Sequence, residues 1–291
     1  MFYNSKKYYS LLLVFALMFF VSNAQTTSMG KDFGFIQQLY NQKLYKEVIY
    51  AADNLDTSSF KIKQYDTLNY YKGICHFQIN NNLLSKDFFL KVSNQSAHFI
   101  EANFYAAYNA TYLKHFNESD TILNGIVLST NDTLFNELVK IEKSGNALLK
   151  RRLNEYQYLD LKESGNYLAE KQRLNKTYTT LINHKRKSPL LAGIMSGILP
   201  GSGKWYAGKK GQAIAAFVTQ LSLGLLTNEA YKNVGIKSIG CIGYASLFSL
   251  FYIGNIWGTV AIVKVADFEF NQTINHEVMV SLKLPLGYVF R

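Results

Sequence analysis

The chain is organised around the stretch SPLLAGIMSGILPGSGKWYAGKK, residues 188–210. Its first part, Leu190–Leu199, is apolar or small throughout, a composition that lets helix backbones approach closely in a membrane. This run is too short to cross a bilayer, which needs roughly 20 apolar residues. Pro200 ends it, because proline lacks the amide donor that a helix needs. The stretch therefore predicts a short interfacial helix at 189–199, a glycine turn, and entry into a membrane span.

The glycine turn also fits the G-x-x-x-x-G-K pattern of a phosphate-binding loop, from Gly203 to Lys209. However, Lys210 stands where that motif has Ser or Thr to hold magnesium, and the preceding segment is not a strand. We therefore interpret the turn as a membrane-interface element and expect no nucleotide partner. The membrane-turn motif comprises Pro200, Gly201, Gly203, Trp205, Tyr206 and Gly208.

Between Ser188 and Gly208 the sequence follows the arrangement S-P-x-L-A-G-x-x-S-x-x-x-P-G-x-G-x-x-Y-x-G. This arrangement resembles a small bacterial membrane domain of unknown function, distantly similar to the two-transmembrane domain family. Lys204 stands where such sequences often carry Gln. The resemblance covers roughly Ser188–Lys264 and implies a Gram-negative envelope protein and a topology. It brings no catalytic residues.

Two longer apolar segments follow the turn and predict a transmembrane helical hairpin. Residues 210–227 give a marginal span of about 18 residues, and residues 238–263 give a stronger span without a charge before Lys264. Asn255 in the second span has two interpretations, a hydrogen bond to the neighbouring helix or the lining of a polar path. The membrane domain is predicted at 184–267, with membrane lipid as a partner.

The N-terminus, residues 1–24, has the parts of a secretory signal peptide: Lys6 and Lys7, an apolar core, and Ala24 before the cut. An uncleaved anchor helix is the alternative. Export places the helical domain in the periplasm and makes the inner membrane the expected location. The basic residues beside the spans conflict with the positive-inside rule, since Lys185–Lys187 would lie outside. Deep penetration of residues 190–199 is an alternative topology that this conflict leaves open.

Residues 25–183 predict consecutive amphipathic helices with short polar breaks. Small and large residues recur after 34 positions, the tetratricopeptide period: Gly73, Ser85, Phe89 and Val92, then Ala107, Ser119, Leu123 and Ile126. The segment is therefore similar to a tetratricopeptide solenoid, whose stacked helix pairs imply a protein-binding face; an irregular helical bundle is the alternative. The candidate protein-binding face comprises Tyr70, Tyr71, Phe104, Tyr105 and Tyr108. Gly145 and Gly165 are candidate helix breaks in the polar segment that leads to the membrane.

The last segment, residues 268–291, alternates apolar and other residues. Val278, Val280, Leu282 and Leu284 fall on one side of this alternation, which is the periodicity of a strand, and Pro285 interrupts it. The sequence therefore predicts a short β-like tail.

No motif for catalysis or metal binding occurs in the chain. None of the five histidines stands at metal-ligand spacing from Cys, Asp or Glu. The net charge of +11 suits nucleic acid or anionic lipid, and the apolar segments favour lipid. We therefore expect a protein that is not an enzyme and has no cofactor, metal or nucleic-acid partner.

The predicted fold class is mainly α: a tetratricopeptide-like helical-repeat solenoid, a transmembrane helical hairpin and a short β tail. The predicted function is a membrane-anchored interaction or scaffold protein of the envelope that binds an unknown protein partner. The alternative is a small membrane component of transport or lipid handling that works through the turn Pro200–Lys210.

Overall fold

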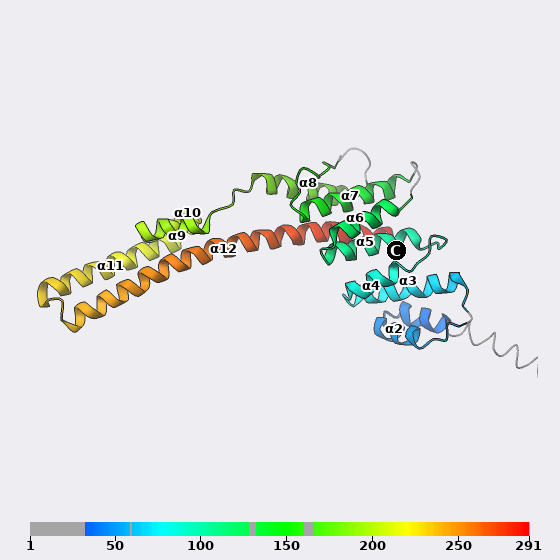
Figure 1. The fold of residues 1–291 in the computed structure, drawn as a ribbon, viewed down its shortest axis with the longest axis horizontal. Helices are drawn as coiled ribbons and strands as arrows, with labels where there is room; N and C mark the ends of the chain where they lie inside the picture. Colours follow the sequence, from blue (N-terminus) through cyan, green and yellow to red (C-terminus); the bar gives the residue numbers. More distant parts are fainter. Residues whose placement is uncertain (1–32, 59, 128–131, 160–165, 291) are drawn as a thin grey trace, which may run out of the picture. The chain divides into compact units, whose positions relative to one another are not determined.

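The computed structural model describes residues 33–290 apart from residues 59, 128–131 and 160–165, so the predicted signal peptide lies outside it. The described chain is mainly helical and contains no strand, which confirms the mainly α class. Contacts divide it into two compact units (Figure 1). The first unit holds the described residues up to Gln172 together with 281–290. The second unit is Arg173–Val280.

The first unit is built from short helices that follow one another along the chain. Each packs against the next, from α2 on α3 to α6 on α7. A helix at residues 33–41 precedes them. The others are α2 (Tyr45–Asp53), α3 (Ile62–Gln78), α4 (Asn82–Phe89), α5 (Phe99–Tyr112), α6 (Phe116–Gly125) and α7 (Thr133–Leu149).

Alternate helices of this unit end in the same tight turn. One residue with a positive φ closes each turn: Lys43, Asn80, Lys114 and Arg151. The next residue then donates its N–H to the carbonyl five residues earlier, as Asn81 does to His76 at 2.8 Å and His115 to Ala110 at 2.8 Å. This is the Schellman ending of a helix. The recurrence divides the unit into helix hairpins, and the second and third turns are 34 residues apart.

The residues that recur in the sequence all lie in the core of these hairpins. The eight buried positions are Gly73, Ser85, Phe89, Val92, Ala107, Ser119, Leu123 and Ile126. A Cβ on Gly73 would lie 2.7 Å from the ring of Phe89, so the large ring requires the glycine. Ser85 also ties the two helices together by donating to the Gly73 carbonyl at 2.9 Å. The 34-residue register thus marks packing positions between paired helices.

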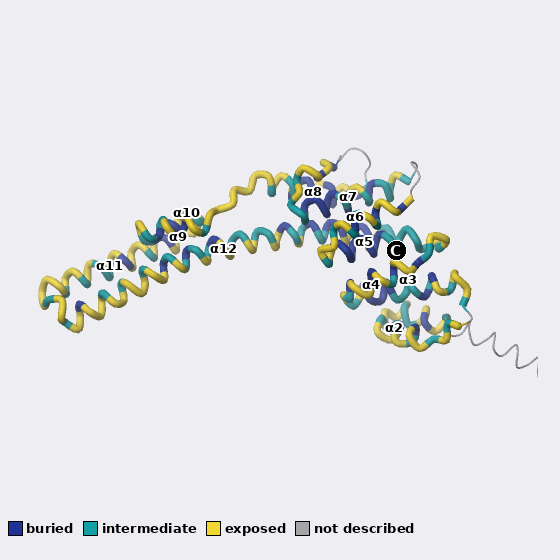
Figure 2. The backbone as a smooth tube through the Cα atoms, viewed as in Figure 1, coloured by how far each residue is buried: buried dark blue, intermediate teal, exposed yellow. Residues whose placement is uncertain are grey.

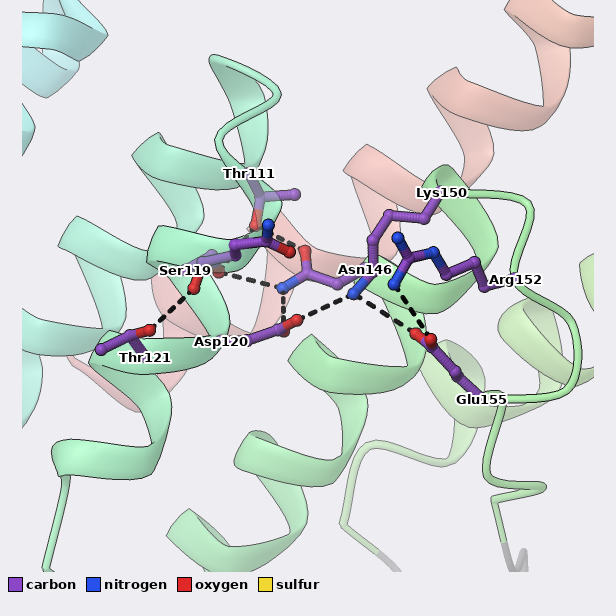
Figure 3. Close-up of polar contacts among 9 residues, drawn as sticks. Thr111, Ser119, Asp120, Thr121, Asn146, Lys150, Arg152 and Glu155 are labelled. Carbon is purple, nitrogen blue, oxygen red and sulfur yellow. Dashed lines mark hydrogen bonds and ion pairs between the residues drawn. The ribbon is translucent and has the colours of Figure 1, made fainter.

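A buried polar cluster joins α5, α6 and α7 (Figure 3). Asn146 accepts from the Thr111 hydroxyl at 2.6 Å and donates to Ser119 at 3.0 Å and Asp120 at 2.8 Å. Lys150 pairs with the second oxygen of Asp120 at 2.9 Å. Because buried amides and hydroxyls are costly without partners, this cluster fixes how α7 packs on the hairpin before it.

The carboxyl of Glu101 on α5 is partly buried and faces α3. Tyr70 donates to Glu101 at 2.5 Å, and the ring of His98 stacks on Tyr70 with its Nδ1 3.9 Å from the carboxyl. Burial raises the pKa of Glu101 to about 7, although the Tyr70 hydrogen bond opposes the rise. The folded protein therefore holds a proton here that the unfolded chain releases near its ordinary value of 4.5.

We expect the stability of the first unit to fall as pH rises from about 4.5 through 7, because the folded state binds more protons than the unfolded state in that window. Replacing Glu101 with Gln should abolish this loss. The check is the melting temperature of both proteins between pH 5 and pH 8. His98 remains in both, so the difference between the two curves isolates the carboxyl. A difference that does not change with pH contradicts the assignment.

The second unit contains α8 (Leu168–Asn183, from Arg173 onward), α9 (Pro189–Ile198), α10 (Ser202–Tyr206), α11 (Lys210–Val234) and α12 (Ile239–Val289, up to Val280). α11 and α12 form an antiparallel hairpin that turns at Gly235, whose φ is 90°. Gln220 donates to the Phe248 carbonyl at 3.4 Å, and Gly224 faces the Phe248 ring. The predicted helical hairpin is therefore present as two paired helices.

In the described part of the chain, one helix, α12, is long and apolar enough to cross a membrane. Only 17% of its most apolar window is buried, whereas the core helix of a soluble protein would be mostly covered. Figure 2 shows exposed residues along both helices of the hairpin. α11 falls short of the same criterion, because Gln212, Gln220 and Glu229 interrupt its apolar residues. The span at 210–227 therefore stays a prediction.

The expected β-like tail is wrong, because α12 continues as helix through residues 268–289. Ile274, Val278, Leu282 and Leu286 are four residues apart and all buried, so they form one ridge of the helix. The alternation in the sequence concealed this spacing of four. Pro285 is accommodated within the helix, near its end.

Candidate functional site

The last turns of α12 pack against α3, α5 and α7 within the first unit. Leu282 and Leu286 are fully buried there. Tyr105 on α5 donates to the Leu286 carbonyl at 3.3 Å, one of the last carbonyls of a helix that lack a partner within it. The ammonium of Lys283 lies 5.2 Å from the ring centre of Phe77 on α3. Helices α3 and α5 therefore both contribute to this contact.

At the end of the chain, Phe290 completes the contact. Its ring stacks on Phe135 of α7 at 6.0 Å and approaches Phe104 at 5.8 Å and Tyr105 at 6.1 Å. Aromatic pairs at these distances add to the energy of burial itself. We call the surface formed by Phe77, Phe104, Tyr105, Phe135 and Gly145, on which the C-terminal turns pack, the aromatic groove.

Gly145 gives the aromatic groove its depth. A Cβ on this residue would lie 2.6 Å from one methyl group of Leu282 and 2.9 Å from the other. The sequence prediction of a helix break at Gly145 is wrong, since this glycine lies within α7. Because Gly145 has no side chain, the Leu282 side chain can lie close to the backbone of α7. Gly165, the other candidate break, lies outside the described residues.

The five residues of the candidate protein-binding face separate into two sets. Phe104 and Tyr105 line the aromatic groove and contact Phe290. Tyr70, Tyr71 and Tyr108 pack inside the stack, Tyr70 against Phe89, Tyr71 against Tyr40, and Tyr108 against Phe77. Sequence reasoning missed Phe135 and Gly145 because their partner lies more than 130 residues further along the chain.

The membrane-turn motif forms the close contact of α9, α10 and α12 in the second unit. A Cβ on Gly203 would lie 1.9 Å from the Ala192 carbonyl oxygen and 2.7 Å from Thr259. The Gly203 N–H donates to the Ser196 hydroxyl at 3.2 Å, which is 3.0 Å from that of Thr259. Only glycine therefore fits at position 203.

The two flanking glycines of the motif turn the chain. Gly201 and Gly208 both have φ of 87°, which other residues adopt only under strain. Gly201 also lies against α11, where a Cβ would meet the Ala213 carbonyl at 2.3 Å. The segment expected as a glycine turn contains a short helix, α10, between two glycine corners. Because the helix α9 precedes it, the context differs from the strand that leads into a phosphate-binding loop.

The remaining motif residues close the turn on one side and leave a groove on the other. The Tyr206 hydroxyl accepts the N–H of Ser188, whose own hydroxyl caps α9 by accepting from Leu191 at 3.3 Å. Pro200 and Trp205 line an almost wholly apolar groove of about 610 Å³ with Phe217 of α11. The motif therefore closes the turn on one side and presents an apolar groove on the other.

In the described residues, no group of three or more His, Cys, Asp or Glu side chains is placed to hold a metal ion. Comparisons of the chain with protein-family models, with curated proteins and with solved structures find no match. The aromatic groove and the membrane-turn motif are therefore the two features of the described chain that bear on its function.

Proposed function

We propose that this protein is a membrane-anchored interaction or scaffold protein of the cell envelope, whose helical-repeat domain binds a helical segment of a protein partner. The observation that carries the proposal is the aromatic groove, which already holds one amphipathic helix end, Ser281–Phe290 of the same chain. Helix-in-groove binding uses apolar anchors at this spacing, here Leu282 and Leu286. The C-terminal segment then acts as an internal occupant that a partner helix displaces.

The membrane part of the proposal is supported by α12, whose apolar window is exposed over most of its length. The wide apolar surface of α11 and α12 includes Leu225, Leu250 and Trp257, each exposed to solvent. Contiguous apolar surface of this kind marks a membrane or protein contact. We place the anchor in the inner membrane and the helical domain in the periplasm.

Photo-crosslinking tests this function in membranes that contain the full chain. A photoreactive phenylalanine analogue replaces Phe135 in the aromatic groove, and in a matched control it replaces Tyr50, which is exposed on α2. We expect one discrete protein adduct from position 135 and none from position 50. Replacing Phe290 with Ala should increase that adduct, because the internal occupant is weakened. Adducts that are the same from both positions, or a chain that washes off the membrane at alkaline pH, contradict the proposal.

A second candidate function, transport or lipid handling through the turn Pro200–Lys210, is supported by a different observation. A cavity with polar residues lies beside Lys204 in the second unit. Replacing Tyr206 with Phe removes the acceptor of the Ser188 N–H and leaves the aromatic groove intact. A loss of phenotype in this variant with the partner adduct unchanged favours the second function over the first.

A further inference from the structure

A cavity of about 360 Å³ opens among α10, α11 and α12 of the second unit. Lys204 of α10 contributes the charged side chain. The remaining lining comes from the two hairpin helices: Ala216, Thr219, Gln220, Leu250, Phe251, Gly254 and Asn255. No acidic side chain is among these residues. The cavity therefore combines one cation, two amides and one hydroxyl with an apolar wall.

The two amides are buried without sufficient partners. Gln220 is 4% exposed and Asn255 is 5% exposed. Within the described structure, both amide atoms of Asn255 and the Oε1 of Gln220 have no hydrogen-bond partner. Burying an amide without a hydrogen-bond partner is unfavourable, so a ligand that supplies the missing partners would stabilise this site. One of the two interpretations of Asn255 is a hydrogen bond to the neighbouring helix. That bond is absent from the described structure, because neither side-chain amide atom has a partner there.

Lys204 is the third side chain of the cavity with a polar group that has no partner in the described structure. Its side chain is half-buried, and it forms no ion pair with any residue that the structure describes. Burial lowers the pKa of its ammonium, the direction expected for a cation without a nearby anion. An anion in the cavity would reverse that penalty and would also accept from the Asn255 amide.

We propose that this cavity binds a phosphate group, with the Lys204 ammonium as its counter-ion and the Asn255 amide N–H as a donor. Leu250 and Phe251 then contact the apolar part of the molecule that carries the phosphate. The phosphate belongs either to an anionic lipid headgroup or to a free ion, and the two sources share this chemistry. The inference is independent of the protein-binding function and deepens the second candidate function by naming its ligand class.

Native mass spectrometry of the full chain, purified in detergent with equal phosphatidylglycerol and phosphatidylcholine, tests the lipid source. We expect retained phosphatidylglycerol, and at least a fivefold loss of it in Lys204→Met and in Asn255→Leu. Lys204→Arg keeps the charge and should retain the lipid. Lys209→Met removes the same charge from an exposed neighbour that does not line the cavity, so it should change little.

A melting curve in lipid-free detergent, with and without inorganic phosphate, tests the free source. A phosphate-dependent rise in melting temperature that Lys204→Met abolishes supports the site with a free ion as its ligand. The proposal is overturned if the purified chain neither retains phosphatidylglycerol nor shows a phosphate-dependent rise in melting temperature. An equal loss of lipid in Lys204→Met and Lys209→Met also overturns it. Because binding is measured on the purified chain, its failure leaves the protein-binding function standing. If the purified chain binds phosphate but no transport phenotype is found, the site stands and the second candidate function is rejected.

Discussion

Replacing Gly203 with alanine is expected to unfold the packing of α9 and α10 against the α11–α12 hairpin. The new methyl group would lie 1.9 Å from a backbone oxygen of Ala192, and backbone cannot move aside as a side-chain end can. Overpacking usually costs about 1–3 kcal/mol and more where the backbone must shift. We therefore expect a loss at or above about 3 kcal/mol. The measurement is the thermal melting of the full chain in detergent, followed by the fluorescence of Trp205 and Trp257.

Gly258→Ala is the matched control for this experiment. Gly258 lies on α12, and a Cβ there meets no atom within 4 Å. Alanine in a helix interior is favoured over glycine by up to about 1 kcal/mol, so this variant should be neutral or more stable. Equal melting temperatures for Gly203→Ala and the natural protein would show that α9 and α10 do not pack as described.

The second large effect is expected at the contact between Leu282 and Gly145 in the aromatic groove. Leu282→Ala removes a fully buried side chain and should cost about 2–5 kcal/mol of the docking of the C-terminal segment. Gly145→Ala places a methyl group 2.6 Å from Leu282 and should also weaken docking. In the double variant each change relieves the other, because the new methyl group enters the space that leucine leaves. The double variant should therefore lose less than the sum of the two, by about 0.5–3 kcal/mol.

Hydrogen exchange of the amides in residues 281–290 measures this cycle. Leu284→Ala, at an exposed position on the same helix, is the control and should change exchange by no more than about 0.5 kcal/mol. Strict additivity of the two substitutions would mean that residues 145 and 282 do not touch.

Much of the helical architecture could be predicted from the sequence, because the information was local. The 34-residue register located packing positions that are buried, such as Ser85 and Ser119. The predicted polar breaks between helices include Asn80, which closes a helix with a positive φ. Pro189 and Pro200 bracketed α9, which begins at Pro189 and ends at Ile198.

The sequence predictions were wrong or incomplete where a local pattern has two interpretations, or where a residue's contact partner lies far along the chain. The alternation of Val278, Val280 and Leu282 also contains a spacing of four, and only the groove that receives the side chains decides between strand and helix. The environment of Tyr105 depends on Leu286, 181 residues further along the chain. No local signal in the sequence reports such a contact.

The polar cavity of the second unit could be predicted only in part from the sequence. Gln220 and Asn255 interrupt otherwise apolar segments, and that interruption is visible in the sequence. That they line one cavity together with Lys204 cannot be seen in the sequence, because it depends on how α10 packs against the hairpin. The likeness to tetratricopeptide repeats remains a proposal, although the helix hairpins and their common turn are consistent with it.

Crosslinking of the C-terminal segment to the aromatic groove tests the central claim most directly. The full chain, with Cys75 and Cys241 replaced by Ala, carries cysteines at Phe290 and Phe135, whose rings stack at 6.0 Å. The control pair joins position 290 to position 50 on α2. We predict rapid intramolecular crosslinking of the first pair by a short bis-maleimide and none of the second. Crosslinking of both pairs at the same rate, or of neither, would contradict an aromatic groove that holds its own C-terminal helix.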